Sequence, residues 1–185
     1  MTVAKETFTT AQLIAKAIKE EDICRVLIEK IIPERTVNEV KVIKNSKSKE
    51  YPMAEEPITA AHFNVKFEDD NKWCDVRIKM VAGSLDPKKI RLDVSSYEIE
   101  NLAETGFYRE EKPLYAIFIC MEDPFEQGVP VYSFQWHDMK KGVKMIEDKS
   151  CIIVINLKCD EEKITEELKP LYRFLLYGES GEIIL

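Results

Sequence analysis

The residues best suited to chemistry lie on two neighbouring segments, 62–66 and 75–79, in which polar and apolar residues alternate. Alternate side chains point to the same face of a β-strand, so the polar members of both segments are expected on one face. This polar set consists of His62, Asn64, Lys66, Asp75, Arg77 and Lys79. Arginine and lysine match the geometry of phosphate and carboxylate groups, which makes the face a candidate anion-binding site. The alternative is a solvated sheet surface on which Asp75 pairs with Arg77 or Lys79.

Several carboxylates close to these segments could hold a metal ion, because Mg²⁺ prefers oxygen ligands. They are Asp69, Asp70, Asp75, Glu98 and Glu100. The simpler interpretation is that they are solvated residues of a turn and of a helix surface. The five cysteines have no CxxC spacing and the chain has two histidines, so a common zinc site is not expected. We expect reduced, mostly buried thiols instead.

The elements that must position the polar face are predicted from periodicity and from turn residues. Helices are expected over 11–19 and 22–32, the second ending before Pro33, followed by a strand over 37–43 and a lysine-rich loop over 44–57. Segments 62–67 and 74–80 are joined by a short polar turn, which is typical of an antiparallel hairpin.

The second half of the chain alternates between helical and buried-strand patterns. We expect a helix over 89–105 ended by Gly106, strands over 114–121, 131–136 and 151–156, and a final helix over 161–177 bent at Pro170. This order predicts one α/β domain over residues 1–185, with a mixed sheet and helices on both sides.

Composition narrows the classes of protein that remain. The chain has 185 residues, of which 45% are hydrophobic and 33% are charged, which excludes a disordered or low-complexity protein. No apolar stretch approaches the roughly 20 residues of a membrane span, so we expect no membrane contact and a cytoplasmic protein. The net charge of −7 disfavours non-specific binding to nucleic acid, although the segment 41–49 is locally lysine-rich.

Four blocks of sequence, together with this order of elements, resemble a nuclease family. The blocks are LIEKII at 27–32, CDVRIK at 74–79, YAIFICMEDPF at 115–125 and GVPVYSF at 128–134. The chain resembles the PD-(D/E)XK nuclease family transposases and recombination-promoting (Rpn/YhgA-like) nucleases over residues 10–177. The resemblance implies a restriction-endonuclease-like core and Mg²⁺-assisted cleavage of phosphodiesters.

The match fails at the residues that would hold the metal. The family places an aspartate on the first hairpin strand, where this chain has Asn64, and a glutamate on the second, where it has Arg77. Lys79 stands at the lysine position of the wider superfamily, and Glu29 matches an acidic residue that some members use from the first helix. A cation at a ligand position repels Mg²⁺, so we expect the inherited activity to be lost.

The resulting hypothesis is a catalytically degenerate nuclease-like protein that acts by binding and needs no cofactor. Its partner would be a basic protein surface or nucleic acid, and a phage or mobile-element inhibitor of a defence enzyme such as a CRISPR effector would fit. The candidate phosphate-binding residues are Lys66, Arg77, Lys79 and Arg91.

Two other hypotheses stay open. The first is a divergent Mg²⁺-dependent nuclease that cuts DNA or RNA through Glu29, Asp75 and Lys79, with a further carboxylate from Glu98 or Glu100. The second is an oligomerisation module, because a homodimer is compatible with the resemblance.

Overall fold

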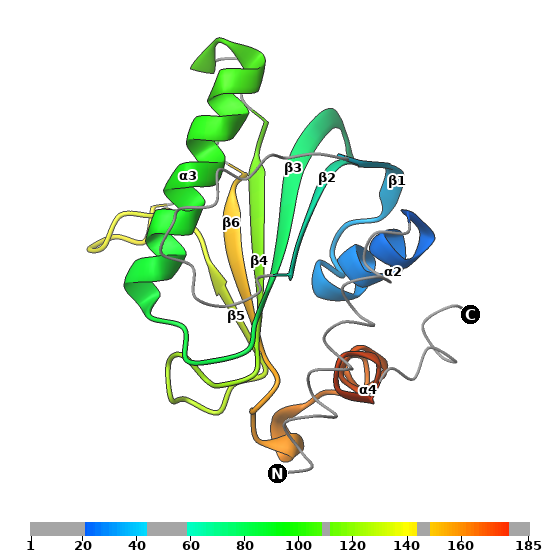
Figure 1. The fold of residues 1–185 in the computed structure, drawn as a ribbon, viewed down its shortest axis with the longest axis vertical. Helices are drawn as coiled ribbons and strands as arrows, with labels where there is room; N and C mark the ends of the chain where they lie inside the picture. The colour runs from blue at the N-terminus through cyan, green and yellow to red at the C-terminus, as the bar shows by residue number, and fades with distance from the viewer. Residues whose placement is uncertain (1–20, 44–58, 109–111, 144–148, 178–185) are drawn as a thin grey trace.

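The structure is a computed structural model, and it describes residues 21–43, 59–108, 112–143 and 149–177. The predicted helix over 11–19 and the predicted loop over 44–57 lie outside these ranges. The described residues form an α/β fold with a six-stranded mixed sheet in the order β1-β2-β3-β4-β6-β5. Helix α3 covers one face of the sheet, and helices α2 and α4 cover the other (Figure 1).

The boundaries of the elements follow the sequence patterns closely in most of the chain. In order they are α2 (Glu21–Ile31), β1 (Val37–Val42), β2 (Thr59–Phe67), β3 (Asp70–Val81), α3 (Pro87–Thr105), β4 (Leu114–Cys120), β5 (Val131–Phe134), β6 (Cys151–Asn156), the 3₁₀ helix η2 (Glu161–Lys163) and α4 (Lys169–Tyr177). Strands β1, β2 and β3 form an antiparallel meander, and β4 runs parallel to both β3 and β6. The mixed sheet with helices on both sides is therefore confirmed for the described residues.

Helix α3 is fixed at both ends by capping residues. The Asp86 side chain accepts a hydrogen bond from the Lys88 N–H at 2.8 Å, and Pro87 occupies the first turn. Gly106 ends the helix with a φ of 77°, and its N–H donates to the Leu102 carbonyl. The predicted stop at Gly106 is confirmed, since a left-handed residue after a helix favours glycine.

The final helix is shorter than the sequence pattern predicts. A helix over 161–177 is wrong for the first part of that range, where η2 and a turn precede α4. Pro170 cannot donate a backbone hydrogen bond, so it fits the first turn of a helix and not its interior. Helix α4 therefore begins at Lys169, one residue before the proline.

The two faces of the sheet differ in character. Apolar side chains of β2 and β3 pack against α2 and α4 in the larger core, which includes Phe63, Val65, Cys74, Val76 and Ile78. The opposite face packs against α3 through a smaller apolar cluster on β4 and β6, which includes Ala116, Phe118 and Val154. On β2 and β3 the face toward α3 carries the polar residues. Helix α3 therefore packs on polar side chains of the hairpin and on apolar side chains of β4 and β6. Among the described residues, no helix is both long enough and apolar enough to span a bilayer.

Candidate functional site

The predicted polar face of the hairpin exists, and helix α3 buries much of it. The antiparallel register of β2 and β3 pairs Asn64 with Asp75 and His62 with Arg77, so these side chains share one face. Asp75, Arg77 and Lys79 on β3 are only 1%, 5% and 6% exposed. The face is therefore not the solvated surface that the sequence left open, but a buried polar layer.

Arg77 lies at the centre of this layer and is held by two carboxylates. Its Nε donates to Asp75 Oδ1 at 2.9 Å and its Nη2 to Asp75 Oδ2 at 3.1 Å, which is a two-point contact between planar groups. Its Nη1 donates to Glu100 Oε2 on α3 at 2.9 Å. The Tyr97 ring lies 5.3 Å from the guanidinium carbon. The guanidinium is thus enclosed by strand and helix together.

Lys79 lies two residues after Arg77 on β3, and its charge is also paired with a carboxylate of α3. Its Nζ lies 2.5 Å from Asp93 Oδ2 on α3, and both side chains are largely covered. Tyr97 follows Asp93 by one helical turn, and burial together with the nearby Asp93 charge raises the pKa of its hydroxyl. The helix face that packs on the hairpin is therefore acidic and aromatic.

His62 completes the layer from β2. Its Nε2 lies 2.8 Å from Asp75 Oδ1, and its side chain is 4% exposed. The alignment is poor for a hydrogen bond, and neither ring nitrogen makes a well-formed one within the described ranges. Buried polar atoms are normally satisfied, so His62 is the least well satisfied member of the layer.

Asp75 stays ionised in this environment because its neighbours outweigh the cost of burial. Burial alone raises the pKa of a carboxyl group. Here the contacts from His62 and Arg77, with the Arg77 charge, overcome that effect and hold the pKa of Asp75 below its ordinary value. The layer therefore contains a carboxylate, not a neutral acid.

Both cations of the layer are paired with carboxylates inside it, which decides what it can bind. Two cations, Arg77 and Lys79, face three carboxylates, namely those of Asp75, Asp93 and Glu100. Neither cation of the layer is left over for a phosphate, and α3 lies where a phosphate would have to enter. The predicted anion-binding role of Arg77 and Lys79 therefore has no support from this geometry.

The same residues do not fit Mg²⁺. The described part of the chain has no group of three or more His, Cys, Asp or Glu side chains arranged to hold a metal ion. A guanidinium 4 Å from a divalent cation would cost about 8 kcal/mol at an effective dielectric constant near 20. Arg77 occupies the space beside Asp75 and Glu100 in which a cation would have to lie.

The remaining predicted site residues lie outside the layer or at its edge. Asn64 is half-buried and its Oδ1 accepts a hydrogen bond from Lys112 Nζ at 3.1 Å. Glu29 lies on α2, across the sheet, and its carboxylate accepts the Val37 N–H at 3.0 Å. Lys66 lies near the Trp73 ring, and Arg91 is exposed on α3. The structure therefore brings Asp75, Arg77 and Lys79 together but leaves Glu29, Lys66 and Arg91 apart.

The other carboxylates considered as metal ligands have different surroundings. Asp69 accepts two hydrogen bonds from the Arg35 guanidinium, which hold the pKa of the exposed Asp69 carboxyl below its ordinary value. Glu98 lines a small open pocket of about 160 Å³ between α3 and the β5 segment, together with Phe134 and Trp136. Asp69 therefore belongs to a surface ion pair, and Glu98 belongs to the lining of a pocket.

The blocks 115–125 and 128–134 contain most of β4, all of β5 and parts of the loop between these strands, and hydrogen bonds to Asp123 hold that loop. Asp123 accepts the N–H groups of Phe125 at 3.0 Å and of Gly128 at 2.7 Å, and the Tyr132 hydroxyl donates to the same carboxylate. Burial opposes ionisation of Asp123, but these hydrogen bonds hold its pKa below the ordinary value. Gly128 has a φ of 61°, and a Cβ there would lie 2.6 Å from Asp160 Oδ2.

Sequence reasoning missed two members of the layer, Asp93 and Tyr97, and considered Glu100 only as a metal ligand. Their spacing was the available signal, because residues 93, 97 and 100 follow the i, i+4, i+7 pattern of one helix face.

Comparisons with protein-family models, curated proteins and solved structures give no match to this chain.

Proposed function

We propose that this protein is a catalytically inactive, nuclease-like protein that acts by binding. The observation that carries the proposal is the position of Arg77. The resemblance to PD-(D/E)XK nucleases places a metal-binding glutamate there, and the structure has a buried guanidinium fixed by Asp75 and Glu100. A site of this kind can hold the fold together, but it lacks the ligands for metal-assisted hydrolysis.

The arrangement of elements supports the restriction-endonuclease-like core that the resemblance implies. That core has a helix, a strand, a hairpin, a second helix and a buried strand in succession. Elements α2, β1, the β2–β3 hairpin, α3 and β4 follow this order, and β4 joins the sheet next to β3. The degenerate positions also lie on the two hairpin strands, as expected for such an ancestor.

A basic protein surface is the partner that the charges favour. The net charge is −7, and the buried cations Arg77 and Lys79 are paired with carboxylates and are not presented at the surface. Five of the eight residues from 160 to 167 are acidic, and all five are exposed. An exposed acidic segment attracts basic surfaces and repels nucleic acid phosphates. An enzyme that handles nucleic acid presents such a basic surface.

The first experiment is a cleavage assay of the whole chain on labelled single- and double-stranded DNA and RNA with Mg²⁺ or Mn²⁺. The wild type is expected to be inert. Glu29 and Lys79 are the two positions at which the chain keeps a residue that the nuclease superfamily uses. The variants Glu29→Gln and Lys79→Met remove the charge at each of them. Wild-type cutting that is lost in either variant would show a rebuilt site and would overturn the proposal.

The same assay includes the double variant Asn64→Asp/Arg77→Glu, which restores the family residues. This change places new carboxylates beside Asp75 and Glu100 and removes the cation between them. The variant is therefore expected to be unstable alone and to gain melting temperature with Mg²⁺, whereas the wild type should not respond. A melting temperature of the wild type that rises with Mg²⁺ would contradict the proposal.

The partner class is tested by neutralising the acidic segment. Changing Glu161, Glu162, Glu166 and Glu167 to glutamine is expected to weaken binding to a basic protein partner and to reduce its salt dependence. The control changes Glu34 and Glu68, two exposed acidic residues elsewhere, to glutamine. Binding that responds equally to both sets of changes would argue against a specific acidic surface.

A further inference from the structure

A small open pocket lies beside β5, the strand at one edge of the sheet. Its volume is about 160 Å³, and residues of α3, β4, β5 and β6 line it. Pockets that take a whole small molecule are usually larger, at roughly 300–1,000 Å³, so this one suits a single side chain. Its lining is mostly apolar and aromatic with one carboxylate, and it includes Val94, Glu98, Leu114, Phe134, Trp136 and Ile152.

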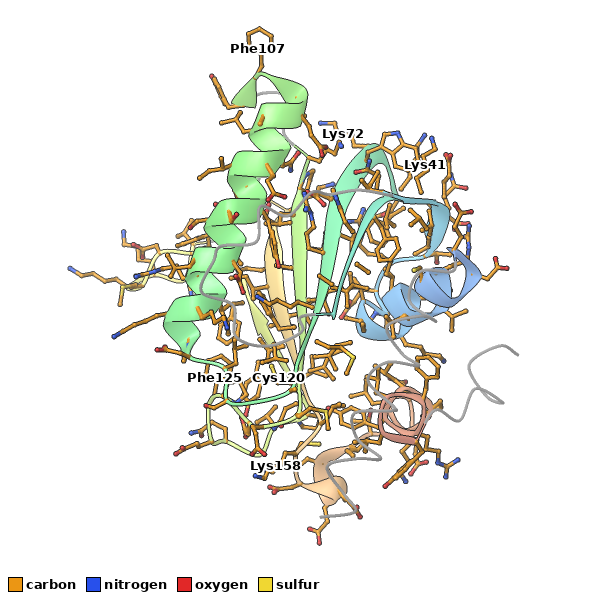
Figure 2. All side chains as sticks on the ribbon, viewed as in Figure 1. Lys41, Lys72, Phe107, Cys120, Phe125 and Lys158 are labelled. Carbon is orange, nitrogen blue, oxygen red and sulfur yellow. The ribbon has the colours of Figure 1, made fainter. Side chains whose placement is uncertain are left out.

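Trp136 contributes an exposed aromatic ring to this pocket. The residue is 58% exposed, and the cation–π contacts of the described residues involve Trp73 and other rings but not Trp136. At the opposite edge of the sheet, Lys41 Nζ lies 4.1 Å from the centre of the Trp73 ring, and Figure 2 shows Lys41 at that edge. The face of an indole ring attracts a cation. Trp136 therefore offers to an outside group the kind of surface that Trp73 offers to Lys41.

Glu98 brings a carboxylate to the same pocket. It already interacts within the chain, but the two oxygens of an ionised carboxylate have about four acceptor positions, so a further donor can be accepted. None of the described residues that line the pocket is a lysine or an arginine. An aromatic ring and a carboxylate in one lining, without a basic residue beside them, favour a cationic occupant.

We propose that this pocket binds an arginine side chain of the partner protein. The inference rests on the proposed function, in which the partner presents a basic surface. Arginine suits the pocket better than lysine, because its planar guanidinium stacks on an aromatic ring and still donates hydrogen bonds to a carboxylate. Its methylene groups suit the apolar part of the lining, which includes Val94 and Ile152. An arginine held in a pocket is a typical anchor of a protein interface.

The test uses the full chain and a single modified amino acid as the probe, so the partner need not be known. N-acetyl-arginine methylamide is titrated to about 50 mM at constant ionic strength, and the neutral N-acetyl-citrulline methylamide, which has nearly the same shape, is the matched probe. Proton–nitrogen NMR spectra follow the indole N–H signals of Trp136 and Trp73. The arginine probe is expected to shift the Trp136 signal in a saturable way, with a dissociation constant on the order of 1–10 mM, and to bind at least about threefold more tightly than the citrulline probe. The Trp73 signal should not move.

Two variants remove the two groups that select a cation. Glu98→Gln and Trp136→Leu are each expected to weaken binding of the arginine probe at least about threefold, measured through the backbone signals of Val94 and Ile152. Trp136→Leu also assigns the two indole signals. Glu68→Gln is the matched control, because it neutralises an exposed acidic residue in the β2–β3 turn, and it should leave the affinity unchanged. Circular dichroism checks that each variant keeps the fold.

Three results would overturn the inference. They are equal affinity for both probes, a Trp136 signal that does not move up to about 50 mM arginine probe, and an affinity that either Glu98→Gln or Trp136→Leu leaves unchanged. None of these results affects the cleavage assay or the test of the acidic segment, so the proposed function can stand when the inference fails. Cleavage of nucleic acid by the wild type would overturn the proposed function without changing how the pocket binds the probes.

Discussion

Replacing Arg77 with methionine is expected to destabilise the protein strongly, although methionine suits a buried position. Asp75 is 1% exposed, and two of the hydrogen bonds to its carboxylate come from Arg77. Removing one partner of a buried ion pair leaves the other charge uncompensated and costs about 3–5 kcal/mol. With an m value of about 2 kcal/mol/M, a loss of about 4 kcal/mol lowers the urea midpoint by about 2 M.

The assay is urea unfolding followed by circular dichroism and tryptophan fluorescence, with Lys89→Met as the control. Lys89 is an exposed cation on α3, and its replacement should change the free energy of unfolding by no more than about 0.5 kcal/mol. Arg77→Lys keeps the charge but loses the planar two-point contact with Asp75, so its midpoint should lie between those of the wild type and Arg77→Met. If Arg77→Met has the same midpoint as Lys89→Met, the account of a tightly coupled buried layer is wrong.

Three further predictions concern other parts of the molecule. Gly128→Ala should lower the free energy of unfolding by about 1–3 kcal/mol, because the φ of 61° at this position disfavours any residue with a Cβ. Gly142→Ala, at a φ of 65°, should have an effect of similar size, and urea unfolding of both variants checks this. The pKa values of Asp75 and Asp123 lie below the ordinary value near 3.8, so both carboxylates stabilise the fold fully above that pH. Stability should fall as the pH drops below about 4, and Asp123→Asn should lessen that fall in acid titrations. Burial raises the pKa of the Cys120 thiol to about 12, so Cys120 should react with a thiol reagent at pH 8 only after unfolding.

Period-two alternation was sufficient to predict the hairpin and its shared polar face. Segments 62–67 and 74–80 form parts of β2 and β3, and the register places Asn64 opposite Asp75 as expected for neighbours on one face. Alternation reports which side chains share a face, but it carries no information on what covers that face. The burial of Arg77 depends on how α3 packs on the hairpin, which is a tertiary contact that alternation within the hairpin cannot show.

The composition of α3 explains why its orientation was difficult to predict. Apolar residues occur on both sides of the helix: Ile90 and Val94 are buried, whereas Leu92 and Ile99 are exposed. A helix with one clear apolar stripe reveals its inner side, but α3 has no such stripe. Its orientation follows from the pairing of its acidic residues with the basic residues of β3, which is a tertiary interaction. Sequence reasoning therefore found the helix and its end at Gly106, but not the side that packs on the sheet.

In the polar layer, cations of the chain itself lie between clustered carboxylates. Asp75, Asp93 and Glu100 would repel one another if no cation lay between them. Arg77 and Lys79 supply that positive charge from within the chain, at distances of 2.9 Å to Glu100 and 2.5 Å to Asp93. The cations are covalently attached, so the stability of the layer should not depend on free Mg²⁺ or on chelators. Under the proposed function, the residue that holds these carboxylates together, Arg77, is also the one that stands at the position of a metal ligand.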